Sequence, residues 1–321
     1  MPAAMMPPAG LDPASNREDR LMQQKWTLAE LPRLDDRIAV VTGANRGLGL
    51  EISVGLAGAG ATVVMACRDP QKAQAAAAEV RRRAPQAKLE LMPLDLADLA
   101  SVRRFAQDFN ARFARLDILC NNGSAIMVPL GKTRDGFETH IGTNHLGHFV
   151  LTGLLLDKLK ATPGSRVVNT ASMAHRLTKG LKLDDLHFER RPYKEMDAYG
   201  QSKLASLLYT FELDRRLRQA GSVVTAVAAH PGWSNTNPDK GSALMRWANS
   251  LMAQPAAMGA LPALYAAAGP EVRGGDYLGP GGFKELRGYP AKVGSSDEAQ
   301  DPQLAARLWE RSELLTGTKY L

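Results

Sequence analysis

The sequence predicts an α/β fold in which a single doubly wound parallel sheet of the Rossmann type carries helices on both faces. Three observations support this prediction. Short apolar runs alternate with longer helical stretches, a glycine-rich turn joins the first run to the first helix, and polar residues follow several of the runs. Because the runs are continuous rather than alternating, the strands are expected to be buried on both faces, as in a parallel sheet.

The apolar runs mark the strands, and the stretches between them mark the helices. Strands are expected at 37–44, 61–68, 88–96, 116–122, 165–172 and 223–232. Helices are expected from near Gly47, up to Arg83, and at 101–113, 137–160, 195–219 and 301–315. The glycine-rich stretch 274–283 and the last helix are expected to close the fold.

The chain shows no clear division into domains. Residues 21–321 contain no internal repeat or low-complexity linker, so they are interpreted as one domain. Residues 1–20 are rich in proline and alanine and are expected to form a disordered N-terminal extension. The stretch 233–275 is less periodic and rich in tryptophan, methionine, alanine and proline, which is typical of a lid over a substrate site.

The composition argues against several classes of function. Of the 321 residues, 40 are basic and 33 are acidic, and the resulting net charge of +7 is scattered along the chain. Basic residues do not alternate with aromatics, so nucleic acid is not an expected partner. The sequence contains no apolar run of about 18 residues or more, so no membrane-spanning helix is expected. Two cysteines outside any CxxC pair, Cys67 and Cys120, favour a cytoplasmic protein, and a homo-oligomer is left open.

The turn "TGANRGLGLE" at 42–51 is the first motif that indicates chemistry. Its glycines at 43, 47 and 49 lie between the first expected strand and the first expected helix. Glycines permit a tight bend and let the backbone approach a diphosphate, whose charge is then stabilised by the amides of the helix N-terminus. The turn therefore predicts a dinucleotide site.

The end of the second expected strand bears on which dinucleotide is bound. An arginine there would accept the 2′-phosphate of NADP, whereas an acidic residue would bind the ribose hydroxyls of NAD. Arg68 follows the strand and Arg46 lies in the glycine turn, so NADP(H) is favoured. Asp69 lies 20 residues after Gly49, which keeps NAD(H) as the alternative.

Polar residues collect where successive expected elements end. In an open α/β sheet ligands bind outside the carboxyl ends of the strands, so these side chains are expected to meet. Asp95 has a second interpretation as a turn or helix cap. The set comprises Asp95, Asn121, Asn122, Asn144, Ser172, Tyr199 and Lys203.

These motifs, in this order, resemble the short-chain dehydrogenase/reductase family. The resemblance rests on "TGANRGLG", the asparagine pair after the fourth strand, Asn144, Ser172 and Tyr199-x-x-x-Lys203. The segments "ACRDP", "GTNHLGHF", "ASMAH" and "GGDYLGP" are similar to the retinol dehydrogenase-like and protochlorophyllide reductase-like branch. The resemblance implies an NAD(P)-dependent oxidoreductase that interconverts a carbonyl and an alcohol by hydride transfer.

The resemblance also implies a role for each catalytic candidate. Tyr199 would be the general acid/base and Lys203 would lower its pKa, which is near 10 for a free phenol. Ser172 would orient the substrate carbonyl, and Asn144 would steady a water relay. The motif and the resemblance together predict a cofactor-binding set of Gly43, Asn45, Arg46, Gly47, Leu48, Gly49, Arg68, Asp95, Leu96, Asn121, Gly123, Tyr199, Lys203, Pro231, Gly232 and Thr236.

Two features depart from the family pattern. The family usually has N-N-A-G after the fourth strand, but the sequence here continues Asn121-Asn122-Gly123-Ser124-Ala125. Ser172 and Tyr199 are 27 residues apart, which indicates an inserted loop at 175–195.

Some interpretations remain as alternatives. A light-dependent reductase of the protochlorophyllide type and a cofactor-binding sensor without catalysis are the rival functions. Three histidines, His140, His145 and His148, lie close in sequence, but no further ligands accompany them and no metal is expected. The apolar residues Trp233, Met245, Trp247, Met252 and Met258 suggest a small lipophilic substrate, although packing against the core explains them equally well.

Overall fold

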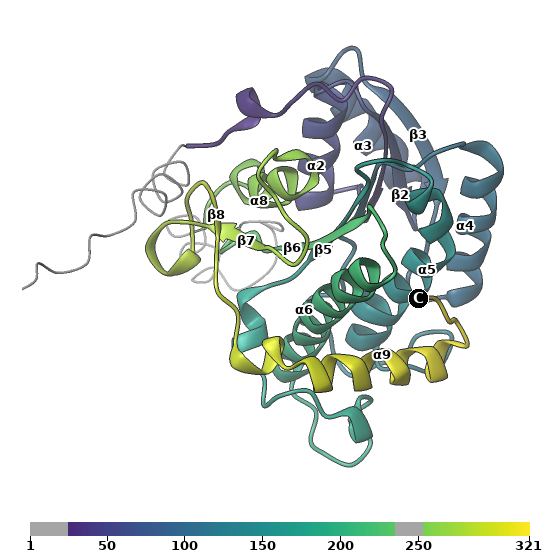
Figure 1. Cartoon of the computed structure of the whole chain (residues 1–321), viewed down its shortest axis with the longest axis vertical. Coiled ribbons are helices and arrows are strands. Elements are labelled where there is room, and N and C mark those ends of the chain that lie inside the picture. The colour runs from purple at the N-terminus through teal and green to yellow at the C-terminus, as the bar shows by residue number, and fades with distance from the viewer. Residues whose placement is uncertain (1–24, 235–252) are drawn as a thin grey trace, which may run out of the picture.

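The computed structural model describes residues 25–234 and 253–321, and its centre is one sheet of eight strands (Figure 1). The strand order is β3-β2-β1-β4-β5-β6-β7-β8, and every neighbouring pair is parallel except β7 with β8. The strands are β1 (Ile38–Thr42), β2 (Thr62–Cys67), β3 (Lys88–Pro93), β4 (Ile118–Asn121), β5 (Arg166–Thr170), β6 (Thr225–Ala229), β7 (Tyr277–Pro280) and β8 (Pro290–Lys292).

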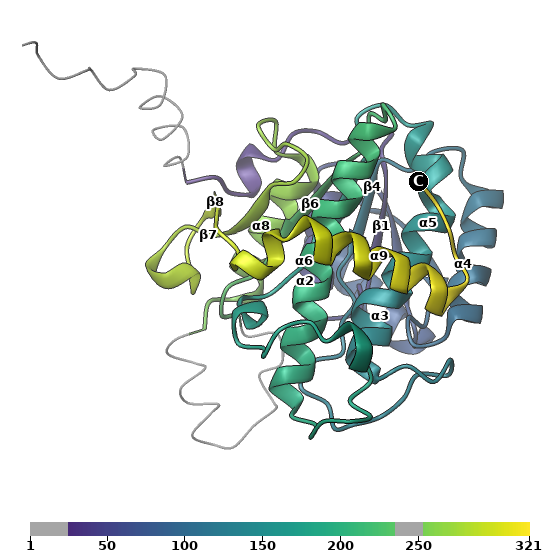
Figure 2. The same cartoon turned by 60° about the horizontal axis from the view of Figure 1, so that its bottom comes forward.

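Helices cover both faces of the sheet. On one face lie α2 (Gly47–Gly58), α3 (Pro70–Arg83) and α8 (Ala256–Ala268); on the other lie α4 (Leu99–Arg112), α5 (Gly147–Lys160) and α6 (Glu195–Gln219). Figures 1 and 2 show α9 (Pro302–Thr316) crossing the outside of α6. The single-turn elements are η1 (Leu28–Glu30), η2 (Ile141–Leu146), η3 (Met173–Arg176), η4 (Leu183–Asp185), η5 (Phe283–Glu285) and η6 (Asp297–Gln300).

Strand β1 shows why the apolar runs are continuous. Ala39 and Val41 belong to the core beneath α2 and α8, whereas Val40 belongs to the core beneath α4 and α5. Successive side chains of a strand point to opposite faces, so a strand covered on both sides needs apolar residues at every position. The predicted fold class, a doubly wound parallel sheet with helices on both faces, is confirmed.

The order of the strands also creates the crevice in which a ligand is expected. The chain runs outward from β1 to β3 and then returns past β1 to β4, so the order reverses between β1 and β4. Loops leaving these two strands go to opposite sides, and a space opens outside their carboxyl ends. The glycine turn follows β1, and the loop with Ser124 follows β4.

The six predicted strands correspond to β1 through β6, whereas the C-terminal part of the sheet was only partly foreseen. Strand β7 lies inside the predicted 274–283 stretch, and β8 adds an antiparallel edge that no sequence pattern indicated. Helix α8 lies in the stretch 233–275 that was interpreted as a lid, yet it packs against α2 in the core. The lid therefore remains a prediction only for 235–252, which lie outside the described residues, as does the predicted extension at 1–20.

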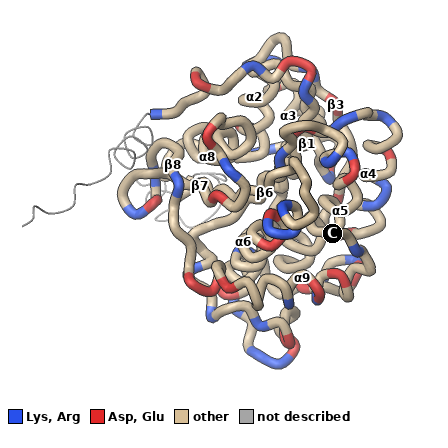
Figure 3. Tube along the Cα trace, viewed as in Figure 1, with Lys and Arg blue, Asp and Glu red and all other residues tan. Residues whose placement is uncertain are grey.

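The charged residues are spread over the described part of the molecule. Figure 3 shows Lys and Arg interspersed with Asp and Glu along the described trace, as the scattered charge of the sequence predicts. Within the described residues, no helix combines the length and the apolar composition that crossing a membrane requires.

Candidate active site

The glycine turn forms a cradle made of backbone. Gly43 and Gly47 have φ angles of +65° and +54°, in the left-handed region that L side chains rarely adopt. A Cβ at Gly49 would lie 2.3 Å from the carbonyl oxygen of Gly43, so only glycine lets helix α2 start this close to the turn. The glycines thus leave main-chain groups of the turn open to close approach by a ligand.

Helix α2 begins without a side-chain cap, unlike α3, α4 and α9. Asp69, Asp98 and Asp301 cap α3, α4 and α9 by accepting hydrogen bonds from backbone amides of the first turn. The N-cap of α2 is Arg46, whose side chain makes no such bond. The first amides of α2 are therefore available to an anion, which the helix dipole also favours.

Thr42 connects the glycine turn to the loop after β4. Its hydroxyl accepts hydrogen bonds from the amides of Asn122 (2.9 Å) and Gly123 (2.8 Å), and its carbonyl accepts one from Asn122 Nδ2 (3.0 Å). Asn121 was predicted beside the cofactor, but its side chain points into the sheet and donates to Thr152 and Asn169. Of the two asparagines, Asn122 is the one whose side chain reaches the glycine turn.

The predicted catalytic pair, Tyr199 and Lys203, lies on the N-terminal half of α6. Lys203 Nζ is 5.7 Å from the centre of the Tyr199 ring, because residues four apart lie on the same helix face. Burial raises the pKa of Tyr199, and a hydrogen bond with Ser172 opposes that rise. Ser172 is brought to the phenol as the N-cap of η3, directly after β5.

Lys203 is a buried cation without a carboxylate partner among the described residues. Its side chain is 2% exposed, and Nζ donates to Ser124 Oγ and to the carbonyl of Thr170, both at 2.8 Å. Burial lowers the pKa of Lys203 to about 7. Ser124 was missed as a functional residue, although its departure from the usual N-N-A-G pattern was the signal that singled out this loop.

Asn144 lies in a turn of π-helix, η2, that leads into α5. Its side chain exchanges hydrogen bonds with the backbone of Ala125 (2.8 and 3.0 Å) and donates to Ser202 Oγ (2.9 Å). Asn144 therefore ties the loop after β4 to helix α6 beside Lys203. π-Helical turns are frequent at functional sites, and this one was not predicted.

The residues predicted to choose between NAD and NADP differ in whether they already have partners in the structure. The Asp69 carboxylate is engaged in capping α3 and in an ion pair with Lys72 (3.2 Å). Arg46 and Arg68 are exposed, and neither has an ion-pair partner within the described residues. Asp95 accepts a hydrogen bond from the amide of Ala97 (3.0 Å), in agreement with its interpretation as a turn residue, and its contact with an adenine stays a prediction.

The segment after β6 closes the far side of the site. A cavity of about 10 Å³ is lined by residues of α2, α8, the ends of β5 and β6 and the loop after β4, which shows that these segments converge. Its lining includes Leu48, Asn122, Thr170 and Pro231. Gly232 has a φ of +63° and stands against the carbonyls of Glu285 and Leu286. Thr236, the last predicted contact, lies outside the described residues.

His230 and Glu285 join this segment to η3. The His230 ring is fully buried, its Nδ1 accepts the amide of Gly232 (3.2 Å), and its Nε2 is 3.1 Å from Glu285 Oε2 without good N–H alignment. Burial lowers the pKa of His230 to about 4. Arg176 binds the same carboxylate through both guanidinium arms (3.1 and 3.2 Å).

Of the three histidines considered above as metal ligands, His145 and His148 contact other protein groups. His145 Nε2 is 2.8 Å from Ser312 Oγ, and His148 lies between Thr42 Oγ1 (2.9 Å) and the carbonyl of Asn144 (3.1 Å). Within residues 25–234 and 253–321, no group of three His, Cys, Asp or Glu side chains is placed to hold a metal ion.

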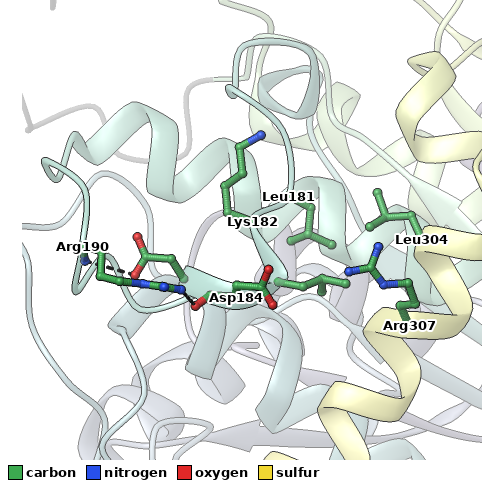
Figure 4. A pocket seen from close by; sticks show the side chains of 8 residues that line it. Leu181, Lys182, Asp184, Arg190, Leu304 and Arg307 are labelled. Atoms are coloured by element: carbon green, nitrogen blue, oxygen red, sulfur yellow. Dashed lines mark hydrogen bonds between the residues drawn. The ribbon is translucent and has the colours of Figure 1, made fainter.

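A separate hollow of about 420 Å³ lies on the surface between the 181–190 segment and α9 (Figure 4). Its side chains are mixed in charge, and Arg190 donates to the carbonyl of Asp184. None of the four catalytic candidates lines it. Its lining residues are Leu181, Lys182, Leu183, Asp184, Asp185, Arg190, Leu304 and Arg307.

The residues at the crevice fit a dinucleotide. A diphosphate requires close backbone approach and exposed amides, and the glycine cradle and the uncapped start of α2 supply both. Ribose hydroxyls require polar donors, and Lys203 has three N–H groups of which two are engaged. These donors lie at the carboxyl ends of β1, β4 and β5, where such ligands bind in this architecture.

Comparison with known proteins agrees with this geometry. A family model described as short chain dehydrogenase matches residues 37–183. The chain is 39% identical over 292 residues to retinol dehydrogenase 13 of Homo sapiens, which covers 88% of this chain and 85% of the relative. It is 39% identical over 313 residues to polyprenol dehydrogenase of Danio rerio, covering 94% and 93%.

Solved structures give the same result. A protein of Mycobacterium paratuberculosis with no assigned function superposes with a TM-score of 0.79 at 44% identity, covering 93% of this chain and all (100%) of that one. The Pseudomonas aeruginosa RhlG/NADP active-site complex superposes with a TM-score of 0.59 at 25% identity, covering 76% and 94%.

Proposed function

The chain belongs to the short chain dehydrogenase family of NAD(P)-dependent oxidoreductases, and on this premise we propose that it interconverts a carbonyl and an alcohol on a small lipophilic substrate, with NADP(H) as its dinucleotide. The bound dinucleotide would supply or accept the hydride. The chain's own residues would align the substrate and handle the proton. The observation that carries this proposal is the meeting of Tyr199, Ser172 and Lys203 at the crevice.

Tyr199 acts as the general acid/base in this proposal. In reduction its hydroxyl gives a proton to the oxygen that becomes the alcohol, and in oxidation the same oxygen takes that proton. The Ser172 hydroxyl, which opposes the rise in the pKa of Tyr199, would bind the same substrate oxygen and hold it in line. Such positioned donors stabilise the alkoxide as its charge develops.

Lys203 and Asn144 support the phenol. A protonated Lys203 favours the ionised phenol through its positive charge, and its unused N–H is available to a ribose hydroxyl. Asn144 holds the loop that carries Ser124 against α6. Its part in a water relay remains a prediction from the resemblance.

The preference for NADP(H) is supported by how the charges near β2 are used. The Asp69 carboxylate is already engaged by two backbone amides and by Lys72, which leaves it poorly disposed to bind ribose hydroxyls. Arg46 and Arg68 are exposed and have no ion pair within the described residues, so either would bind a 2′-phosphate without first breaking one.

A lipophilic substrate is supported by the names of the relatives and by apolar side chains around the crevice. Several large apolar residues that follow β4, β5 and β6 in the chain, and one at the start of α6, are exposed and would be available to an apolar substrate. They are Ile126 (48% exposed), Met127 (40%), Leu130 (55%), Leu177 (65%), Met196 (41%) and Trp233 (41%).

The test is a panel of aldehydes, ketones and alcohols, assayed in the dark with NADPH, NADH and their oxidised forms. We expect turnover of apolar members and faster turnover with the phosphorylated dinucleotide. No turnover of any member with any dinucleotide would overturn the proposal. Turnover that requires light would instead favour a protochlorophyllide-type reductase, and tight dinucleotide binding without turnover would favour a sensor.

We also place the protein in the cytoplasm, because Cys67 and Cys120 are both free thiols inside the core. Fractionation of the source cells tests this placement, and recovery of the protein outside the cytoplasmic fraction would contradict it.

A further inference from the structure

A buried acid–histidine pair lies directly against the catalytic ring and has no role in the mechanism above. Glu138 is 1% exposed and His140 is 0% exposed, and both precede the π-helical turn that carries Asn144. The His140 ring meets the Tyr199 ring edge-on, with centroids 6.0 Å apart and an interplanar angle of 61°. Edge-to-face contacts of this kind are directional, so the orientation of one ring influences the other.

The hydrogen bonds of His140 fix both its tautomer and its rotation. The amide of Val128 donates to Nε2 (3.3 Å), so this nitrogen carries no proton. The proton therefore resides on Nδ1, which donates to Glu138 Oε1 at 2.8 Å. With both nitrogens engaged on opposite sides, the ring cannot turn without breaking one of the two bonds.

Glu138 is held as firmly as the ring it orients. Its Oε1 accepts the amide of His140 and its Oε2 accepts the amide of Ile141, both at 2.9 Å. The carboxylate thus binds the backbone at the start of η2 as well as the imidazole. A buried charge that is bonded in this way is costly to disturb.

Tyr193 extends this arrangement to the inserted loop at 175–195. Its hydroxyl donates to the carbonyl of Val128 (2.7 Å) and lies 3.2 Å from His140 Nδ1. The backbone of Val128 is therefore hydrogen-bonded on both sides: its amide donates to His140, and its carbonyl accepts from Tyr193. The insertion, which lengthens the interval between Ser172 and Tyr199, therefore contacts His140, the residue that packs against the Tyr199 ring.

We propose that His140 is a positioning residue for Tyr199, oriented by Glu138 and braced by Tyr193 of the insertion, so that the angle of the catalytic phenol depends on this chain of contacts. The proposal rests on the proposed function for its kinetic consequence, but the geometry it claims can be measured without any substrate. His140 touches the ring and not the reacting oxygen.

The test compares His140→Gln with His145→Gln. Glutamine at 140 keeps an acceptor for the Val128 amide and removes the aromatic edge. His145 is a matched control, because it is also buried (1% exposed) and lies within η2, which His140 precedes, but its Nε2 contacts Ser312 of α9. H140Q is expected to lower kcat by about tenfold or more, with KM for the dinucleotide within about twofold, whereas H145Q keeps kcat within about twofold.

A readout independent of turnover is the NMR spectrum of the protein carrying ¹³C-labelled tyrosine, in which the Tyr199 ring signal is identified by its loss in Tyr199→Phe. The signal is expected to shift in H140Q and to stay in place in H145Q. If the wild-type protein turns over no carbonyl, the proposed function fails while this spectrum still tests the positioning role. A Tyr199 signal and a kcat that are the same in H140Q as in H145Q would overturn the inference.

Tyr193→Phe provides a second variant in case H140Q does not fold. It keeps the ring and removes only the hydroxyl that grips Val128. We expect a shift of the Tyr199 signal and a loss of kcat of about two- to fivefold. An unmoved signal together with an unchanged kcat in Y193F would contradict the role assigned to the insertion.

Discussion

The two halves of helix α6 treat buried charge in opposite ways. In the C-terminal half, the carboxylate of Glu212 is 1% exposed and is bound by Arg215 (2.6 and 2.7 Å) and Arg216 (2.7 Å). In the N-terminal half, Lys203 is 2% exposed and its ammonium meets only neutral oxygens, those of Ser124 and Thr170. A charge that is fully paired serves the fold, whereas a buried charge held without a counter-ion destabilises the fold and is available for function.

The largest effect is expected at the phenol. Tyr199→Phe removes only the hydroxyl, so kcat should fall by about 10²- to 10⁴-fold, the range for a general acid, while dinucleotide affinity stays within about threefold. The control is Tyr209→Phe in the other half of α6, where the hydroxyl contacts Tyr320 Oη (2.9 Å). Y209F is expected to retain kcat within about twofold. Equal activity in the two variants would contradict the role of Tyr199 as the general acid/base and the difference drawn between the two halves of α6.

The next substitution is expected to lower activity and to raise stability. Lys203→Met removes a cation whose pKa is lowered by burial. Because the unfolded chain binds this proton up to the ordinary lysine pKa and the folded chain releases it near pH 7, the group opposes folding at neutral pH and less so as pH rises. K203M should therefore lower kcat/KM by about 10²-fold or more and raise Tm by about 2 °C.

Glu212→Gln is the matched change in the paired half. It leaves two arginines without their carboxylate, so it should cost about 1–3 kcal/mol and lower Tm, with activity within about twofold. Burial raises the pKa of Glu212, but the two arginines together outweigh burial and hold this pKa below its ordinary value. Their contribution is therefore present above the ordinary carboxyl pKa and is lost as pH falls through the lowered one. Loss of activity in E212Q, or loss of stability in K203M, would show that the two halves do not differ as described.

A smaller effect should separate two adjacent residues at the start of α3, Arg68 and Asp69. Arg68→Ala is expected to reduce the preference for NADPH over NADH by about tenfold, because one charge-assisted contact to the 2′-phosphate is lost. Asp69→Ala should cost about 0.5–2 kcal/mol through the lost cap of α3 and leave the dinucleotide preference unchanged. Dissociation constants for both dinucleotides, measured by fluorescence in each variant, check the pair. A change of preference in D69A alone would restore the NAD interpretation.

The fold could be predicted because its information is local. Val40 and Val41 face opposite cores, so an uninterrupted apolar run already identifies a strand covered on both sides. The spacing of Tyr199 and Lys203 places them on one helix face whatever the rest of the chain does. Helix α8 was not foreseen, because its burial is decided by contact with α2, about two hundred residues earlier in the chain.

The site could be predicted less completely, because its supporting contacts join distant segments. Ser124 binds Lys203 across 79 positions, and Glu285 binds Arg176 across 109, and neither pairing has a sequence pattern. His140 was noticed only as a candidate metal ligand, since its contact with Tyr199 depends on how the loop at 125–130 and η2 fold. Burial could not be inferred from the sequence either: it raises the pKa of Tyr199 and lowers that of Lys203, and the effect of Lys203 on the phenol stays a prediction.

The most direct test of a buried, carboxylate-free Lys203 is its own titration, followed by NMR with ¹³C-labelled lysine and assigned by comparison with K203M. The signal should titrate near pH 7, and bound dinucleotide should move the midpoint upward because it favours the charged amine. A midpoint at the ordinary lysine pKa of about 10.4, unmoved by dinucleotide, would contradict the account.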